Sequence, residues 1–228
     1  MEEADVVVTN HDLVLSDLRL GGGVILPAPE DSLYVFDEGH QLPTKCLNQF
    51  ALRFHAGGTL QGLRDRERWL AASAKAWMAQ GLDERLIPGM TSLLADLIQR
   101  SEDAAELLWH LLPPDELERA EYRFPHGRIP AELAEQAAGL VAQWGQLNRE
   151  AIRLEAALDN SQSSGASSAE GATGSSMDPD LNLANAQGLV ARAEQQLAVW
   201  RAFADAPGEG LPGDGWARWC HHRGTPQT

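Results

Sequence analysis

Four consecutive residues, Asp37-Glu38-Gly39-His40, carry the side chains with the clearest chemistry in this sequence. They directly follow Leu33-Tyr34-Val35-Phe36, a short apolar run that is typical of a buried strand. Open α/β sheets place functional carboxylates at strand ends of this kind. Hydrolysis of a phosphoanhydride needs one carboxylate to hold Mg²⁺ and a second group to orient or deprotonate the attacking water. Adjacent Asp and Glu residues at a strand end can divide these two roles, because they point in different directions.

The residues before the tetrad predict a small α/β part. Asp5-Val6-Val7-Val8-Thr9 is short, apolar and β-branched, like a second buried strand. A short helix is expected from Leu13 to Leu20, and Gly21-Gly22-Gly23 ends it. We expect the two strands to be parallel, so that Asn10-His11 lies at the same sheet edge as the tetrad. Two strands do not make a stable sheet alone, which points to a piece of something larger.

From about Leu42 onward the apolar pattern is helical, and two helices carry a heptad seam. We expect these helices over 130–158 and 179–204, joined as an antiparallel α-hairpin. Residues 160–177 are rich in Ser and Gly and predict a flexible linker between them. The seam positions are Leu133, Ala137, Leu140, Trp144, Leu147, Ala151, Leu154 and Leu158, then Leu183, Ala186, Val190, Ala193, Leu197, Trp200 and Ala204.

Composition excludes several classes of function. The chain has 228 residues, with 33 acidic and 18 basic side chains and a net charge of −15. Tight nucleic-acid binding by general electrostatics is therefore not expected, because it depends on clustered Lys and Arg. Two cysteines are too few for a disulfide framework, a structural zinc site or a self-contained iron–sulfur cluster. No run approaches the roughly 20 apolar residues of a membrane span, so we expect a soluble, cytoplasmic protein that does not bind membranes.

The stretch from Glu3 to Pro43 closely resembles the DinG-type helicases, bacterial relatives of the iron–sulfur XPD helicases in superfamily 2. In that family an Asn-His pair after an apolar strand precedes motif II, a Walker B box often spelled Asp-Glu-Gly-His or Asp-Glu-Ala-His. A largely helical arch domain is inserted after motif II. Looser similarity to that arch continues in Glu121-Tyr122-Arg123-Phe124, Gly127, Pro130, Val199-Trp200-Arg201 and Trp216-Ala217.

The resemblance implies roles for the tetrad in an ATP-dependent 5′–3′ DNA helicase of the DNA-repair type. Asp37 would hold Mg²⁺ through water, Glu38 would activate the hydrolytic water, and His40 would couple the nucleotide state to DNA binding. Asn10, His11 and Gly39 match the family signature without an assigned chemical step. ATP and Mg²⁺ are the implied cofactors and single-stranded DNA the implied partner. A housekeeping helicase and a CRISPR-associated relative both fit this stretch.

The sequence also departs from the family. Neither of its two lysines, Lys45 and Lys75, belongs to a Gly-Lys-Ser/Thr phosphate loop. The four cysteines that bind the family's 4Fe-4S cluster are absent as well, and so is the second motor domain. We therefore expect an internal piece: the end of a RecA-like motor domain (1–43), a helical arch (44–206) and a Pro/Gly/Trp tail (207–228). Alone, this piece is expected to be inactive, with weak or no DNA binding.

The alternative hypothesis is a non-catalytic helical module that binds protein or DNA and carries a relic of the tetrad. Other candidate sites are weaker. Cys220-His221-His222 supplies too few ligands for a metal and is expected to be a solvated tail. Arg64, Arg66 and Arg68 alternate with acidic residues, which predicts a solvated helix face. The seven tryptophans mostly occupy seam or tail positions and are expected to serve packing.

Overall fold

The computed structural model describes residues 4–79, 81–83, 85–111, 121–163, 178–206 and 217–221. The chain divides into two compact units, Met1–Arg53 and Phe54–Thr228. The first unit thus extends beyond residue 43, because the helix that follows the tetrad packs within it. In the described part of the chain, no helix is both long and apolar enough to cross a membrane.

The first unit contains two helices, α1 (His11–Arg19) and α2 (Leu42–Phe50), with single 3₁₀ turns at Pro29–Asp31 and Gly39–Gln41. The predicted short helix is confirmed as α1. It begins at Asn10, whose side-chain oxygen accepts a hydrogen bond from the Leu13 amide at 2.8 Å. Its end is set by three glycines at positive φ, a conformation that costs glycine little.

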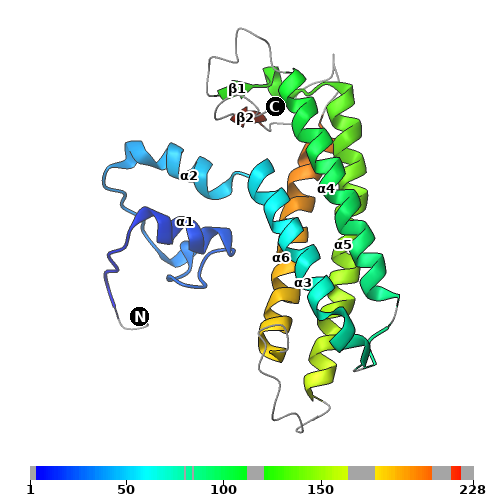
Figure 1. Ribbon diagram of the computed structural model, residues 1–228. Helices are drawn as coiled ribbons and strands as arrows, with labels where there is room; N and C mark the ends of the chain where they lie inside the picture. Colours follow the sequence, from blue (N-terminus) through cyan, green and yellow to red (C-terminus); the bar gives the residue numbers. More distant parts are fainter. Residues whose placement is uncertain are drawn as a thin grey trace. The chain divides into compact units, whose positions relative to one another are not determined.

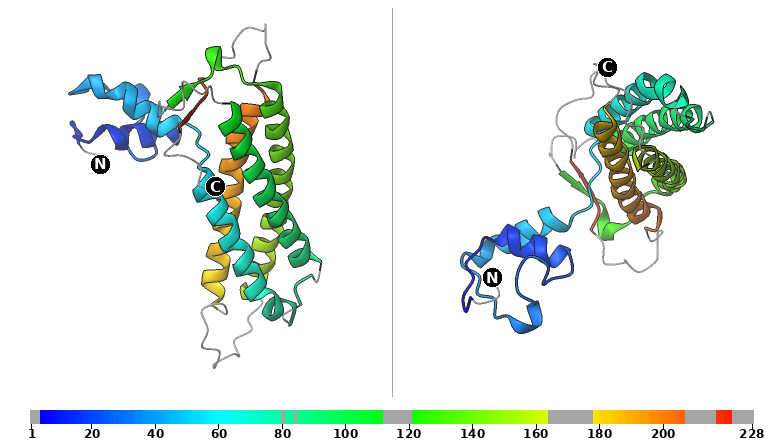
Figure 2. Two further views of the ribbon diagram at one scale, coloured as in Figure 1. Left: turned by 45° about the horizontal axis from the view of Figure 1, so that its top comes forward. Right: turned by 90° about the horizontal axis from the view of Figure 1, so that it is seen from below.

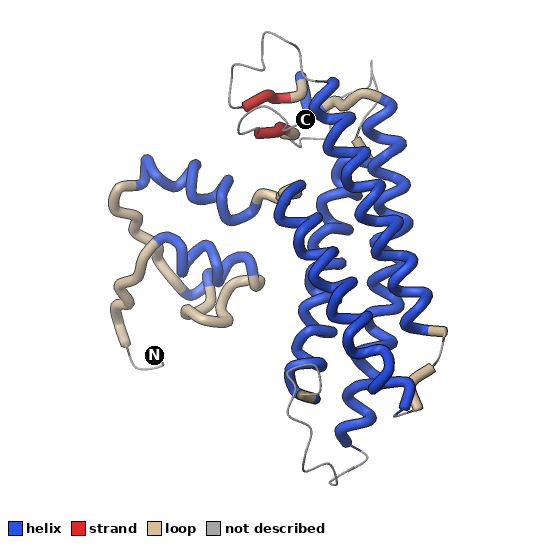
Figure 3. Tube along the Cα trace, viewed as in Figure 1, coloured by secondary structure: helices blue, strands red, loops and turns tan. Residues whose placement is uncertain are grey.

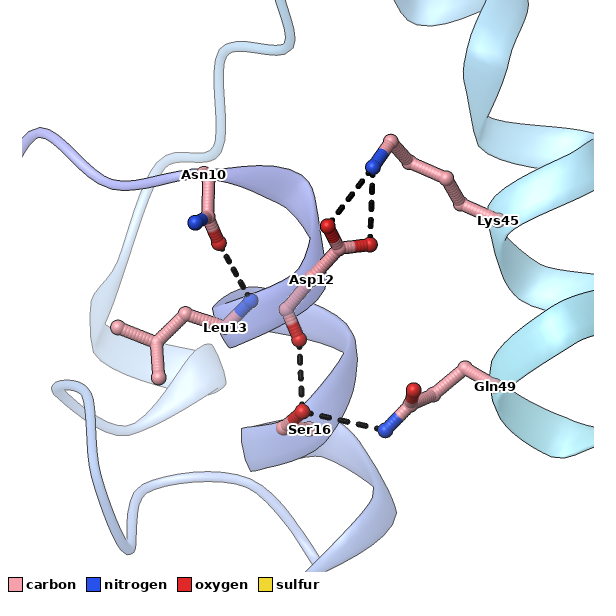
Figure 4. Close-up of polar contacts among 6 residues, drawn as sticks. All are labelled: Asn10, Asp12, Leu13, Ser16, Lys45 and Gln49. Carbon is pink, nitrogen blue, oxygen red and sulfur yellow. Dashed lines mark hydrogen bonds and ion pairs between the residues drawn. The ribbon is translucent and has the colours of Figure 1, made fainter.

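Polar side chains join α1 to α2 (Figure 4). The ammonium of Lys45 contacts both carboxylate oxygens of Asp12, at 2.8 and 2.9 Å. One turn further along both helices, Gln49 donates to the hydroxyl of Ser16 at 3.1 Å. Because both partners advance by four residues in the same direction, the two helices run parallel.

The predicted parallel strands are the main error in the expected fold. Residues 5–9 and 33–36 are extended, but neither segment forms a β-ladder in the described structure. The side chains of Val8 and Leu33 are 93% and 92% exposed. A parallel ladder is stable only with further strands and with both faces covered, and the described residues of this unit supply neither.

The second unit is a bundle of four long helices (Figures 1 and 2). They are α3 (Ala56–Ala79), α4 (Leu86–Leu111), α5 (Ala131–Ser163) and α6 (Pro179–Ala204). Helices α3 and α4, α4 and α5, and α5 and α6 pack as neighbours. Side chains of α3 also contact α6, which closes the bundle.

The predicted α-hairpin is confirmed by α5 and α6, which lie side by side along their length (Figure 3). All eight seam residues of α5 are buried, with exposed fractions from 0 to 5%. On α6, Ala186, Ala193, Leu197 and Trp200 are buried, and Leu183, Val190 and Ala204 pack against the same core. Helix α5 continues to Ser163, so the first residues of the predicted linker are helical. Residues 164–177 of that linker lie outside the described part.

A two-stranded ribbon corrects the prediction for residues after 206. Strand β1 (Glu121–Arg123) pairs antiparallel with β2 (Trp219–His221), with Tyr122 opposite Cys220. Cys220 is half-buried against Phe124, Ile129 and Leu133, and burial raises the pKa of its thiol. The expected solvated tail is therefore wrong for Cys220, which packs against a small second core. His222 lies outside the described residues.

Candidate active site

The Asp37–His40 tetrad lies in an exposed turn that leads into α2. The carboxylate of Asp37 accepts a hydrogen bond from the Glu38 amide at 3.0 Å. The carboxylate of Glu38 lies 3.2 Å from Nδ1 of His40, and their side chains are 63% and 73% exposed. Both acidic groups are therefore accessible to a ligand from solvent, and the imidazole can respond to what Glu38 binds.

Glu38 has an unusual backbone conformation, with φ of 51° and ψ of 38°. This left-handed region is unfavourable for residues with a side chain, and such residues are concentrated at functional sites. Gly39 follows in the 3₁₀ turn, and a Cβ built at this position would contact nothing within 4 Å. The backbone at Gly39 is thus open to solvent rather than packed against another segment.

One member of the Asn10-His11 pair contacts Phe36, the residue directly before the tetrad. The imidazole of His11 is 5.7 Å from the ring of Phe36, centroid to centroid. Phe36 in turn stacks on Tyr34 at 6.1 Å, so alternate residues of the extended segment face the same way. The structure therefore places His11 against the residue that precedes the tetrad, without the expected sheet. Asn10 caps α1, which gives it a structural role.

The donor set for a cation is small. No group of three or more His, Cys, Asp and Glu side chains within the described residues has a geometry that could hold a metal ion. Mg²⁺, however, is usually held by one or two carboxylates together with water and substrate phosphates. The exposed carboxylate of Asp37 could supply one ligand in that mode.

Asp17 is a positioning residue that the sequence pattern did not single out beyond its place on the first helix. Its side chain is fully buried, and one carboxylate oxygen accepts the amides of Val24 and Ile25 at 2.9 and 2.6 Å. The other oxygen accepts the Gly23 amide at 2.9 Å. The hydrogen bond from Ile25 is the largest cause of the lowered pKa of Asp17, and it opposes the effect of burial. The sequence signal for this interaction is an Asp four residues before a glycine triplet. We call the hydrogen bonds from the amides of residues 23–26 to Asp17 the loop clamp.

Comparisons with known proteins identify the relatives of this arrangement. An ATP-dependent DNA helicase DinG from Photobacterium profundum is 32% identical over 142 residues, which is 61% of this chain. The DinG helicases of Salmonella paratyphi A and Shigella flexneri are 32% and 29% identical, each over 59% of the chain. The chain is similar to a segment of DinG-type helicases.

The similarity to DinG has defined limits. The matched segment is 20% of the Photobacterium protein and 19% of the Salmonella and Shigella proteins, so the chain spans about a fifth of these relatives. No protein-family profile matches the chain. The expected DinG-type resemblance is thus confirmed, whereas the roles of individual residues stay predictions.

Proposed function

We propose that this chain is the part of a DinG-type ATP-dependent DNA helicase that carries motif II and the helical arch after it. The observation that supports the proposal is the contact of His11 with Phe36, the residue before the Asp37–His40 tetrad, in a chain similar to DinG helicases over about 60% of its length. The exposed carboxylates and the left-handed Glu38 are the features expected of a turn built to meet a ligand.

In this proposal the tetrad works on a bound ATP–Mg²⁺ complex. Asp37 would hold the Mg²⁺ through water. Its carboxylate is exposed, and one of its oxygens already accepts a hydrogen bond from the Glu38 amide. Glu38 would accept a proton from the attacking water. His40 contacts Glu38 and would transmit a change at that carboxylate to the DNA-binding parts. The bound Mg²⁺ would neutralise the charge that develops on the phosphates.

The exposed apolar side chains of the first unit support its assignment to a motor domain. Large apolar residues that are highly exposed concentrate there, among them Val6, Val8, Leu33 and Val35. In the extended segment, Leu33 and Val35 face solvent, whereas Tyr34 is half-buried, which is the alternation of a β-strand. A sheet of a RecA-like domain would bury the exposed set and would supply the partner strands.

The second unit has the geometry of an inserted domain. The ring of Phe54, where the unit begins, lies 4.8 Å from that of Trp200 on α6. Arg218, next to β2, donates to the carbonyl of Ala202 at 2.7 Å. The first residue of the unit and a residue near its C-terminal strand therefore both contact the last turns of α6, as is expected of an arch placed within a motor domain.

The test is an assay of the complete gene product that contains this chain. It is expected to have a Gly-Lys-Ser/Thr loop and four cysteines upstream, and to hydrolyse ATP when single-stranded DNA is present. A Glu38→Gln variant should lose most of this hydrolysis, by about 10²-fold or more, because a general base is removed. Glu30→Gln is the matched control in the same unit and should retain it.

Equal hydrolysis by the Glu38→Gln variant and the wild type would refute the proposal. A gene product without the phosphate loop would also refute it, and it would favour a helical module that binds protein or DNA without catalysis.

A further inference from the structure

Two arginines on facing helices of the bundle adopt a reciprocal arrangement. Helix α3 contains Gly62-Leu63-Arg64-Asp65-Arg66, and α6 contains Gly188-Leu189-Val190-Ala191-Arg192. A Cβ built on Gly188 would lie 3.1 Å from Nη2 of Arg66, and one built on Gly62 would lie 3.4 Å from Nη2 of Arg192. Each guanidinium therefore reaches across and lies over the glycine that is four residues before the other arginine.

Neither of these two arginines is held in a close ion pair within the described part of the chain. Positions three and four residues away from each arginine on its own helix, where ion pairs form, hold only Gly, Leu, Trp and Gln. Asp65 and Glu67 flank Arg66 in the sequence, and Glu194 is two residues from Arg192. Asp65 is bound by Arg68 and Gln61.

Arg66 is held in place by neutral groups. Its Nη1 donates to Asn185 at 2.5 Å, and its guanidinium lies over the ring of Trp69 at 5.9 Å. Trp69 is itself fixed, because its indole nitrogen donates to Asn182 at 2.9 Å. The predicted solvated face is thus wrong for Arg66, which is half-buried and faces α6, although Arg64 and Arg68 are exposed. Burial and then the charge of Arg192 lower the pKa of Arg66, in accord with two cations that lie close together.

We propose that Arg66 and Arg192 form a binding site for a phosphate group of single-stranded DNA on the α3–α6 face of the bundle. Each guanidinium reaches the opposite helix, and neither is in an ion pair with a described carboxylate, so both can contribute donors to one anion. Guanidinium matches phosphate geometry in a bidentate way. Arg192 is exposed and Arg66 is positioned beforehand, so the ligand can enter from solvent. The identity of the ligand as DNA rests on the proposed helicase function.

The test measures binding of a fluorescein-labelled oligothymidine of about 16 nucleotides to the 228-residue chain, between about 50 and 200 mM salt. Because the chain has a net charge of −15, binding will be weak and needs high protein concentration. Arg66→Gln and Arg192→Gln should each weaken binding about tenfold at low salt. Each should also reduce the slope of log K against log salt by about 0.7, as expected for one lost phosphate contact.

Matched variants separate the site from a general charge effect. Arg153→Gln removes the same charge from an exposed arginine that is paired with Glu150, and it should bind DNA like the wild type. Gly188→Ala introduces a Cβ against Arg66 without a change of charge and should weaken binding. Thermal unfolding confirms that each variant is folded. Inorganic tripolyphosphate should compete with the DNA.

Three outcomes would overturn the proposal: no DNA binding by the wild-type chain, equal losses in Arg153→Gln and in the two site variants, or binding of tripolyphosphate without DNA. Glu30→Gln lies in the first unit, outside the proposed catalytic residues, and should leave DNA binding by this chain unchanged. A failure of the phosphate site is therefore distinguishable from a failure of the proposed ATP hydrolysis, which is measured through Glu38.

Discussion

Arg218 and Gly127 are joined across 91 residues of chain by a hydrogen bond of 2.8 Å from guanidinium Nη1 to the glycine carbonyl. The Nε of Arg218 also donates to the carbonyl of Ala202, near the end of α6. The Arg218 side chain is buried. One guanidinium thus connects β2, the turn before α5 and the last turn of α6, and it satisfies carbonyls that have no helical donor.

Arg218→Lys should lower the free energy of unfolding of the second unit by about 1–3 kcal/mol. A single ammonium cannot reproduce the fixed fork that reaches both carbonyls. Urea denaturation monitored by circular dichroism measures the change. Arg201→Lys, at an exposed position on α6, is the control and should change the stability by less than about 0.5 kcal/mol. Equal midpoints for the two variants would contradict the role given to Arg218.

Leu147→Asp should destabilise the bundle by at least about 3 kcal/mol, because it places an unpaired carboxylate in a fully buried seam position. The same substitution at Ile152, which is 46% exposed on the same helix, should cost far less. Thermal unfolding of both variants provides the comparison. A small effect at Leu147 would show that the α5–α6 seam is not packed as described.

Asp17→Asn should loosen the loop of residues 23–26, because an amide oxygen accepts fewer backbone hydrogen bonds than a carboxylate. Since folding lowers the pKa of Asp17, the stability that its ionised form contributes is complete above the unfolded value of about 3.9. It is lost as the pH falls through the folded value. Hydrogen exchange of the Ile25 amide should therefore accelerate at low pH in the wild type.

The Asp17→Asn variant should show fast exchange at Ile25 at neutral pH as well. Asp12→Asn is the control on the same helix, because Asp12 binds Lys45 instead of the loop amides. Protection of Ile25 that is the same in all three proteins would argue against the clamp.

Glu38→Gly should leave the first unit as stable as before, or more stable by up to about 1 kcal/mol, because glycine adopts the left-handed conformation without the steric cost. Hydrogen exchange in α2 reports this stability. Glu30→Gly, where φ is not positive, should destabilise the unit by about 0.5–1 kcal/mol. A larger loss of stability in Glu38→Gly than in Glu30→Gly would contradict the strain assigned to Glu38.

The 228-residue chain alone should neither hydrolyse ATP nor unwind DNA. It contains no Gly-Lys-Ser/Thr loop, on which tight nucleotide binding depends. Arginine fingers in related reactions contribute roughly 10³ to 10⁵ in rate, and the resemblance assigns that arginine to a motor domain beyond this chain. Phosphate release with Mg²⁺ and single-stranded DNA measures the activity. Turnover that disappears in Glu38→Gln would show that the chain is a complete catalyst.

The α5–α6 hairpin could be predicted from the sequence because its signal is local. The seam of α5 repeats at steps of three and four residues, and every seam position from Leu133 to Leu158 is buried. The strands could not be predicted reliably, since an apolar run such as Leu33–Phe36 becomes a strand only with partners that pair with it. The environment of Arg66 could not be predicted either, because it depends on a residue far away in the sequence. Its alternating charged neighbours indicate a solvated face, but its guanidinium donates to Asn185 on another helix.

The meeting of Phe54 and Arg218 at the end of α6 also determines how the bundle would respond to mechanical load. Tension applied to the chain on both sides of this unit would act across Trp200 and Ala202, two residues apart on one helix. Such a load separates contacts one after another from that end, so each step needs little force. The opposite end of the hairpin, near Ser163 and Pro179, would bear no tension until the contacts beside Trp200 had opened.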